Sequence, residues 1–231
     1  MSQTVVITGA NRGLGLEFCR YYLNRGDNVI ACCRHPSSAS ELDELKLDFT
    51  KHISIHALDI TKEAQHRGFI AALGRTKIDI LINNAGIYGS KGLAIEQIGA
   101  DEWSHVLQVN AISPMLFTRN LKNNLNKNAK IVFVTSKMGS IGDNSSGGSY
   151  MYRSSKAALN AAAHSLAVDW AELSFNVAIL HPGWVKTDMG GPNALITAVQ
   201  SVTGMCSVIE GLDSDDSGQF INYDSQPIPW Q

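Results

Sequence analysis

The chain has 231 residues, of which 44% are hydrophobic and 17% charged, and this balance predicts one compact domain with a sizeable core. The net charge of −2, with no basic block, speaks against nucleic-acid binding. No apolar run approaches the roughly 18 residues of a membrane span, and the first residues lack a signal-peptide pattern, so a cytoplasmic protein with no membrane partner is expected.

Predicted strands alternate with predicted helices along the whole chain. Apolar, β-branched runs predict strands at 4–8, 28–33, 52–58, 78–82, 129–135 and 175–180, with a weaker one at 219–222. Amphipathic patterns between them predict helices at 14–23, 40–48, 61–73, 101–125, 152–173 and 195–210. Several strands are continuously hydrophobic, as expected when helices cover both faces of a sheet. We therefore expect an α/β fold with a doubly wound parallel sheet, Rossmann-type, in a single domain over residues 1–231.

A glycine-rich turn joins the first predicted strand to the first predicted helix, and it reads Thr8-Gly9-Ala10-Asn11-Arg12-Gly13-Leu14-Gly15. Glycine permits a tight turn and a close approach of backbone to a ligand, and the free N–H groups at a helix start favour a pyrophosphate. Three glycines alone are a weak signal, because glycine is common in loops. The strand before and the helix after them favour a dinucleotide site.

A second candidate site lies in the run Ser149-Tyr150-Met151-Tyr152-Arg153-Ser154-Ser155-Lys156. If this run opens a helix, Tyr152 and Lys156 stand four residues apart and share a face, whereas Tyr150 has Ser154 at that offset. A phenol has a pKa of about 10, and a nearby ammonium favours its ionised form. Tyr152 is therefore the candidate acid/base. The alternative, that Tyr152 merely packs at a helix start, stays open from this pair alone.

These two stretches and several further motifs resemble the short-chain dehydrogenase/reductase family over essentially the full chain. The further motifs are Asn83-Asn84-Ala85-Gly86, Asn110 in a long helix, Ser136 after the fifth strand, and Pro182-Gly183-Trp184-Val185-Lys186-Thr187 after the sixth. The context of Tyr152 and the ending from Gly218 to Trp230 resemble the subgroup of C-factor-like proteins and small carbonyl reductases.

The resemblance implies hydride transfer between a nicotinamide and a carbonyl or alcohol carbon. It implies that Tyr152 exchanges the proton, and that Lys156 holds the nicotinamide ribose and lowers the Tyr152 pKa. Ser136 would bind the substrate oxygen. Asn110 matches a helix asparagine associated with a water-mediated proton path to the lysine, although it could instead satisfy local backbone.

The position of the serine carries an ambiguity. The spacing usual in relatives would select Gly139, which cannot act, so Ser136 is preferred with the extra residues placed in the polar loop 143–148. Ser140 and Ser149 are the alternatives.

The resemblance also implies where the cofactor lies. Asp59 would contact the adenine amino group, although it could instead cap the following helix. Val185 and Thr187 would contact the carboxamide and the phosphates, and Asn84 could be only a turn residue. The full set of predicted cofactor residues is Gly9, Asn11, Arg12, Gly13, Leu14, Gly15, Arg34, Asp59, Ile60, Asn83, Ala85, Gly86, Tyr152, Lys156, Pro182, Gly183, Val185 and Thr187.

The residues after the second strand favour NADP(H). NAD-dependent relatives usually carry an acidic residue there, but this chain reads Cys32-Cys33-Arg34-His35-Pro36-Ser37. Arg34 could bind a 2′-phosphate, and Arg12 occupies a position that is basic in NADP-preferring relatives. Either arginine alone could be an ordinary surface cation.

The segment left for substrate recognition is short. A lid at about 189–217, with Trp184, Leu195 and Ile196 as an apolar wall, would fit a small or exposed carbonyl compound. The four cysteines have no CxxC spacing and are expected as reduced core thiols, and no metal site is expected. Small residues around the 152–173 helix predict a homodimer or homotetramer. A nucleotide-binding signalling or regulatory protein is the alternative function.

Overall fold

The computed structural model describes residues 2–230 and contains one sheet of seven strands. The strands are β1 (Thr4–Thr8), β2 (Asn28–Cys33), β3 (Ile53–Ala57), β4 (Ile78–Asn83), β5 (Leu125–Val134), β6 (Asn176–His181) and β7 (Phe220–Asn222). All neighbours pair in parallel, in the order β3-β2-β1-β4-β5-β6-β7. The predicted doubly wound parallel sheet is confirmed.

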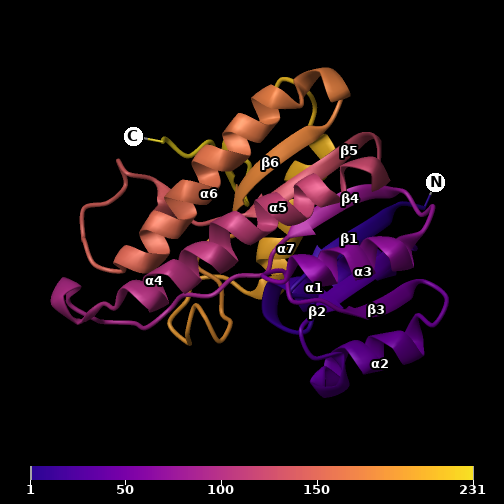
Figure 1. The fold of residues 1–231 in the computed structure, drawn as a ribbon, viewed down its shortest axis with the longest axis horizontal. Coiled ribbons are helices and arrows are strands. Elements are labelled where there is room, and N and C mark those ends of the chain that lie inside the picture. The colour runs from indigo at the N-terminus through magenta and orange to yellow at the C-terminus, as the bar shows by residue number, and fades with distance from the viewer. Residues whose placement is uncertain (1, 231) are drawn as a thin grey trace.

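Helices cover both faces of the sheet (Figure 1). One face carries α1 (Gly13–Asn24), α2 (Ser40–Asp48) and α7 (Ala198–Gly211), and the other carries α3 (Glu63–Leu73), α4 (Ala100–Leu107), α5 (Ser113–Asn120) and α6 (Tyr150–Asp169). Side chains of β5 alternate between the two cores: Val132 and Val134 pack on one side, Ile131 and Phe133 on the other. This alternation explains why the strands read as unbroken apolar runs.

The prediction of a single helix at 101–125 differs from the structure in detail. The helical path continues from α4 through a π-helical turn, Gln108–Ile112, into α5, and it ends at Asn120. A short 3-10 turn, Lys122–Asn124, follows, and β5 begins at Leu125, earlier than predicted. The π turn carries Asn110 in a buried position. Such bulges re-aim side chains and are frequent at functional sites.

The order of the strands creates a crevice for a ligand. From β1 the chain moves outward to β2 and β3, and then returns to the other side of β1 as β4. The turns that leave the carboxyl ends of β1 and β4 therefore diverge over opposite faces, and a crevice opens between them. The glycine-rich turn and the segment Asn83–Gly86 both lie at this point.

The predicted lid at 189–217 contains a core helix, and its role as a lid stays a prediction. Its middle is α7, whose residues Val202, Met205, Cys206 and Ile209 are buried against the sheet. The residues of this region that line the pocket described below are Lys186 to Met189, at or before the predicted start. Of the residues predicted as an apolar wall, Leu195 is 77% exposed and Trp184 50%. Within residues 2–230, no helix has the length and apolar character needed to cross a membrane.

Candidate active site

A pocket of about 450 Å³ opens at the carboxyl ends of the central strands. It gathers predicted residues from every part of the chain: Gly9, Asn11, Arg12, Gly13, Leu14, Arg34, Asp59, Ile60, Ala85, Gly86, Tyr152, Lys156, Pro182 and Thr187. These residues follow different strands, and the parallel sheet brings the ends of those strands to one edge. The predicted cofactor region and the predicted Tyr–Lys pair thus share one pocket.

Glycines allow the turn after β1 to pack against the turn after β4. Gly9 has a φ of 65°, and a Cβ at this position would lie 2.9 Å from the Cα of Ala85. At Gly15 a Cβ would lie 2.1 Å from the Gly9 carbonyl oxygen. Asn84 donates from Nδ2 to the carbonyls of Thr8 (3.0 Å) and Gly9 (3.2 Å). A larger residue at either glycine would separate the two turns that form the crevice.

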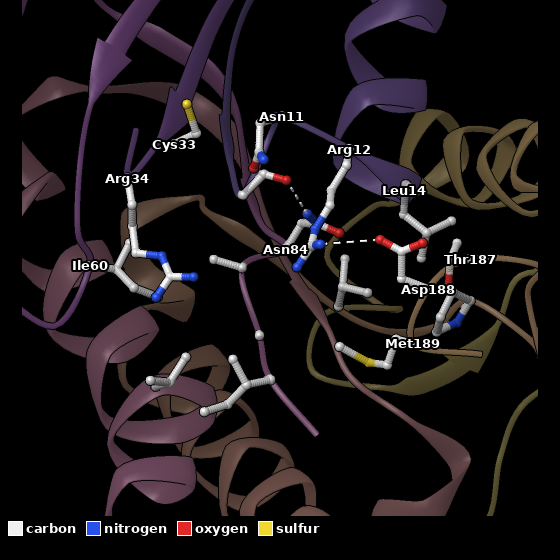
Figure 2. Close-up of a pocket in the computed structure, with 18 of the residues that line it drawn as sticks. Asn11, Arg12, Leu14, Cys33, Arg34, Ile60, Asn84, Thr187, Asp188 and Met189 are labelled. Atoms are coloured by element: carbon white, nitrogen blue, oxygen red, sulfur yellow. Dashed lines mark hydrogen bonds and ion pairs between the residues drawn. The ribbon is translucent and has the colours of Figure 1, made fainter. Parts of the chain in front are cut away.

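The two predicted phosphate-binding arginines lie on different walls of the pocket (Figure 2). Arg34 lies beside Ile60, whereas Arg12 donates to the carboxylate of Asp188 at 3.1 Å. The side chains of Arg12 and Asp188 are 68% and 82% exposed, so water screens this ion pair and its contribution to stability is small. Arg12 therefore already has an anionic partner from the protein.

Asp59 shapes the turn before α3. Its carboxylate accepts hydrogen bonds from the Thr61 backbone N (2.9 Å) and hydroxyl (2.7 Å), so it closes a local turn and does not cap α3 itself. Partial burial acts to raise the pKa of Asp59, but the Thr61 hydrogen bonds and the positive charges of Lys62 and Arg34 outweigh it, and the pKa is lowered. Asp59 is thus a charged acceptor on the pocket wall.

Some predicted cofactor residues lie behind the pocket wall. Asn83 is buried and donates from Nδ2 to the Thr118 hydroxyl at 3.0 Å, because the alternation of β4 turns its side chain toward α5. Gly15, Gly183 and Val185 do not line the pocket either. At Gly183 a Cβ would meet Ile196 and Tyr223 within 3.0 Å, so this glycine serves close packing.

The pocket has members that the sequence did not identify. They include Cys33, Glu41, Asn84, His105, Lys186, Asp188 and Met189. Cys33, Asn84 and Lys186 lie in motifs quoted from the sequence, but no cofactor role was predicted for them. All four cysteines are free and buried, as was predicted for thiols of the core. Among residues 2–230 there is no cluster of His, Cys, Asp or Glu suited to a metal ion.

Tyr152 and Lys156 lie on one buried face of α6, as their spacing predicts, whereas Tyr150 is 39% exposed. Lys156 Nζ donates to the Val134 carbonyl at 2.9 Å and lies 5.8 Å from the centre of the Tyr152 ring. Burial raises the pKa of Tyr152 to about 12 and lowers the pKa of Lys156 to about 8. Burial is the main cause of the shift in the Tyr152 pKa, and the Lys156 ammonium is bonded to a carbonyl, so the lowering of the Tyr152 pKa by Lys156 stays a prediction.

Of the three candidate serines, Ser136 is the one whose hydroxyl acts on the pKa of Tyr152. Burial raises the pKa of Tyr152, and the Ser136 hydroxyl acts in the opposite direction. Ser136 is buried and does not line the pocket. Its hydroxyl oxygen accepts from Met138 N at 3.1 Å and begins the 3-10 turn Lys137–Gly139. The alternatives have other partners: Ser140 Oγ donates to the Pro229 carbonyl (2.7 Å), and Ser149 Oγ is bonded to the Tyr88 hydroxyl (2.8 Å).

Asn110 joins the π turn to the loop after β4. Its Oδ1 accepts from Ile87 N at 2.8 Å, and its Nδ2 donates to the Ile87 carbonyl (2.7 Å) and to Ser155 Oγ (3.0 Å). A Cβ on Gly86 would lie 3.2 Å from Asn110 Oδ1 and 3.7 Å from Lys156 Nζ, so the amide and the ammonium flank the same glycine. Asn110 thus satisfies backbone, but on a neighbouring loop.

Comparison with known proteins gives one consistent result. A family model for short chain dehydrogenases matches residues 3–195. C-signal of Myxococcus xanthus is 40% identical over 166 residues, which cover 71% of this chain and 99% of that protein. A short-chain dehydrogenase/reductase of Burkholderia multivorans with bound NADP superposes at a TM-score of 0.94, with 31% identity over 100% of both chains. NADPH-bound carbonyl reductase from chicken fatty liver superposes at 0.90, with 33% identity over 99% of both chains.

Proposed function

Because the chain belongs to the short-chain dehydrogenase family, we propose that it is an NADP(H)-dependent oxidoreductase of the carbonyl reductase type. The observation that carries this proposal is that Tyr152 and Lys156 line a pocket whose other wall is the glycine-rich turn, while the Ser136 hydroxyl acts on the pKa of Tyr152. The whole chain would act as one cofactor-binding domain in the cytoplasm.

The residues of the pocket fit a dinucleotide phosphate. The turn after β1 has no side chain at Gly9 and Gly13, and it leads into the amino end of α1, where N–H groups and the helix dipole favour phosphate. Ile60 and Asp59 offer an apolar wall and a charged acceptor at the far end, with Arg34 beside them. NADP would supply the hydride-carrying nicotinamide when bound.

Side chains of the protein would supply the proton that the reduction of a carbonyl requires. Tyr152, whose pKa burial raises to about 12, is protonated at neutral pH, so the phenol can donate to the oxygen of a carbonyl as that oxygen gains negative charge. The Ser136 hydroxyl would bind the same oxygen and fix its position. Lys156 would hold the ribose hydroxyls and, as an ammonium, would favour the phenolate that donation leaves behind. Asn110, which flanks Gly86 together with Lys156, would take part in a proton path to the lysine through water.

A signalling role is the second candidate, because C-signal is 40% identical to this chain. Such a protein would need the cofactor only to stabilise a surface. The buried phenol beside a lysine favours the enzyme, since a binding module has no use for a proton donor held inside its pocket.

One experiment distinguishes the reductase from the signalling protein. The protein is incubated with NADPH and a panel of aldehydes and ketones, and the absorbance of the nicotinamide is followed. We expect oxidation of NADPH with at least one small carbonyl compound. Tight NADPH binding, measured by calorimetry, with no turnover across the panel would reject the reductase and favour the signalling role.

A further inference from the structure

An unassigned tyrosine lies flat against the proposed proton donor. The rings of Tyr88 and Tyr152 are stacked, with centroids 4.4 Å apart and planes at 18°. Tyr88 belongs to the loop after β4, which no motif beyond Gly86 marked. Stacked aromatic rings constrain each other's planes, and a ring on one face of a phenol keeps water from that face.

The Tyr88 hydroxyl bridges both ends of the loop that separates Ser136 from Tyr152. It is 2.8 Å from Ser149 Oγ, and it lies 3.9 Å from Met138 Sδ. Ser149 occupies the N-cap position of α6 with a φ of 49°, but its side chain makes no cap hydrogen bond. The serine hydroxyl that would ordinarily cap the helix is bonded to Tyr88 instead.

Neighbouring residues hold Tyr88 in place. Asn110 binds both the N–H and the carbonyl of Ile87, which fixes the backbone just before Tyr88. Lys91 Nζ lies 5.1 Å from the centre of the Tyr88 ring and donates to the Met189 carbonyl at 2.8 Å. The loop after β6 is therefore linked through Lys91 to the same stack.

We propose that Tyr88 is a positioning residue for Tyr152. Its ring sets the plane of the phenol and excludes water from one face, and its hydroxyl holds the Ser136 turn and the start of α6 in register. The role rests on the proposed function, since it concerns the proton donor of that reaction. Asn110 contributes indirectly, because its amide fixes the loop that carries the stacked ring.

The groups that face the Tyr152 phenol determine the pH at which it titrates. Tyr152 is faced by Tyr88 from the loop after β4, by Ser136 from the turn after β5 and by Lys156 from its own helix. Lys91 lies over Tyr88, and Glu102 of α4 accepts from Ser90 N in the same loop. Removing the Tyr88 ring admits water, which favours the phenolate and moves the Tyr152 titration to lower pH.

Two variants separate the ring from the hydroxyl. Tyr88→Phe keeps the stacked ring and loses only the contacts of the hydroxyl with Ser149 and Met138. Tyr88→Leu keeps an apolar side chain but loses the planar ring that stacks on Tyr152. We expect Tyr88→Leu to lower kcat by roughly 10- to 100-fold, the size of effect that a misplaced catalytic group produces. The NADPH Kd should not change, and the alkaline limb of the reduction rate should move to lower pH. Tyr88→Phe should recover most of kcat, and Tyr150→Phe should behave as wild type.

A readout without turnover keeps this proposal separate from the proposed function. In protein labelled with carbon-13 at tyrosine Cζ, the Tyr152 signal is identified by its loss in Tyr152→Phe. In Tyr88→Leu this signal should shift and should titrate at lower pH, even if no substrate has been found. An unchanged Tyr152 signal and an unchanged pH profile in folded Tyr88→Leu would overturn the positioning role. Absent turnover in the wild type would count against the reductase alone.

Discussion

Tyr150 and Tyr152 lie in the same first turn of α6, yet only Tyr152 faces the pocket. Tyr152→Phe removes the proton donor but keeps the ring, so we expect activity to fall by roughly 100-fold or more, as for loss of a general acid. NADPH affinity should be retained. Tyr150→Phe, at an exposed position 6.5 Å from Trp103, should remain active. Steady-state rates and NADPH titrations check this, and an inactive Tyr150→Phe beside an active Tyr152→Phe would reverse the assignment.

Arg12 and Arg34 should discriminate between the two nicotinamide cofactors. A charge-assisted hydrogen bond contributes roughly 1.5–3 kcal/mol, so each arginine is expected to change the NADPH Kd by about tenfold to a hundredfold. Alanine at either position should weaken NADPH and leave NADH almost unaffected, because only NADPH carries the 2′-phosphate. Asp188→Asn releases Arg12 from its ion pair and should strengthen NADPH binding. Equal losses for both cofactors in calorimetric titrations would contradict this assignment.

We expect the buried Lys156 to lower the free energy of unfolding, although the proposed active site needs it to bind the cofactor. Its ordinary pKa is 10.5, and burial lowers this to about 8, a difference that corresponds to roughly 3 kcal/mol at 1.36 kcal/mol per pKa unit. Below pH 8 the folded protein carries a desolvated charge. Between pH 8 and 10.5 the folded state loses the proton before the unfolded state does, so wild-type stability rises with pH.

Lys156→Met tests this directly. At pH 7 the variant should be more stable by up to about 3 kcal/mol, less the loss of the bond to the Val134 carbonyl. The difference should shrink as the pH approaches 10.5, and cofactor binding should be impaired at every pH. Urea unfolding at pH 7 and pH 10 measures both effects. A variant that is less stable at pH 7, or a gap that widens with pH, would contradict the assignment.

Local patterns revealed the residues whose role depends on spacing along the chain. The helical offset of Tyr152 and Lys156 and the glycines of the first turn are visible in sequence because each sits within one turn of structure. Asp188 and Tyr88 could not be found in this way. Arg12 meets Asp188 across 176 residues, and Tyr88 meets Ser149 across 61, so only the folded sheet brings them together.

At the scale of elements, the packing of the Ser136 turn on α6 sets the geometry of the site. A Cβ on Gly139 would lie 2.8 Å from the carbonyl carbon of Lys156 and 3.0 Å from Ala157 N. Backbone atoms cannot move aside as a flexible side chain can. We therefore expect Gly139→Ala to destabilise the protein by roughly 1–3 kcal/mol, as overpacking does, and to lower kcat.

Gly68 provides the matched control for Gly139. It lies inside α3, and a Cβ at this position meets nothing within 4 Å. Gly68→Ala should stabilise the protein by roughly 0.5–1 kcal/mol, the difference in helix propensity, with unchanged kcat. Thermal unfolding and steady-state rates check the pair. A Gly139→Ala protein as stable and active as wild type would show that the turn can shift away from α6.

The positions of strands and helices were predicted well where apolar runs were long. They were predicted poorly where the same sequence pattern fits two different structures. The residues from 101 to 125 keep a helical pattern through the π turn, and residues 126–128 of β5 are polar, so the sequence alone could not mark either boundary. The lid stays a prediction, because the apolar face of α7 reads in the sequence equally as a pocket wall or as core. Only packing against the sheet separates these possibilities.

At the scale of the whole molecule, we expect a homodimer or homotetramer built on α6 and the α4–α5 region. The outer side of α6 exposes Ala158, Ala161, Ser165 and Val168, and small residues let helices approach closely. A two-fold contact would set the same surface on both subunits. Sedimentation velocity should show at least twice the 25.0 kDa mass of the chain.

Ala161→Glu should dissociate such an oligomer, because a charge would be desolvated at the contact. Leu47→Glu, at an exposed position of α2, should leave the mass unchanged. A wild-type species at 25.0 kDa would show that the chain is a monomer and would refute the oligomer.

The central place of β1 also governs how the chain can assemble. Thr4 N donates to Asp79 at 2.8 Å across 75 residues, and Val5 pairs with Ile80. A polypeptide emerging from the ribosome can pair β1 with β2 and β3 early, but the other edge of β1 stays bare until β4 is synthesised. Bare apolar edges template association between chains, and distant pairings are slow to close. Nascent chains shorter than about 80 residues should therefore be the species most dependent on chaperones.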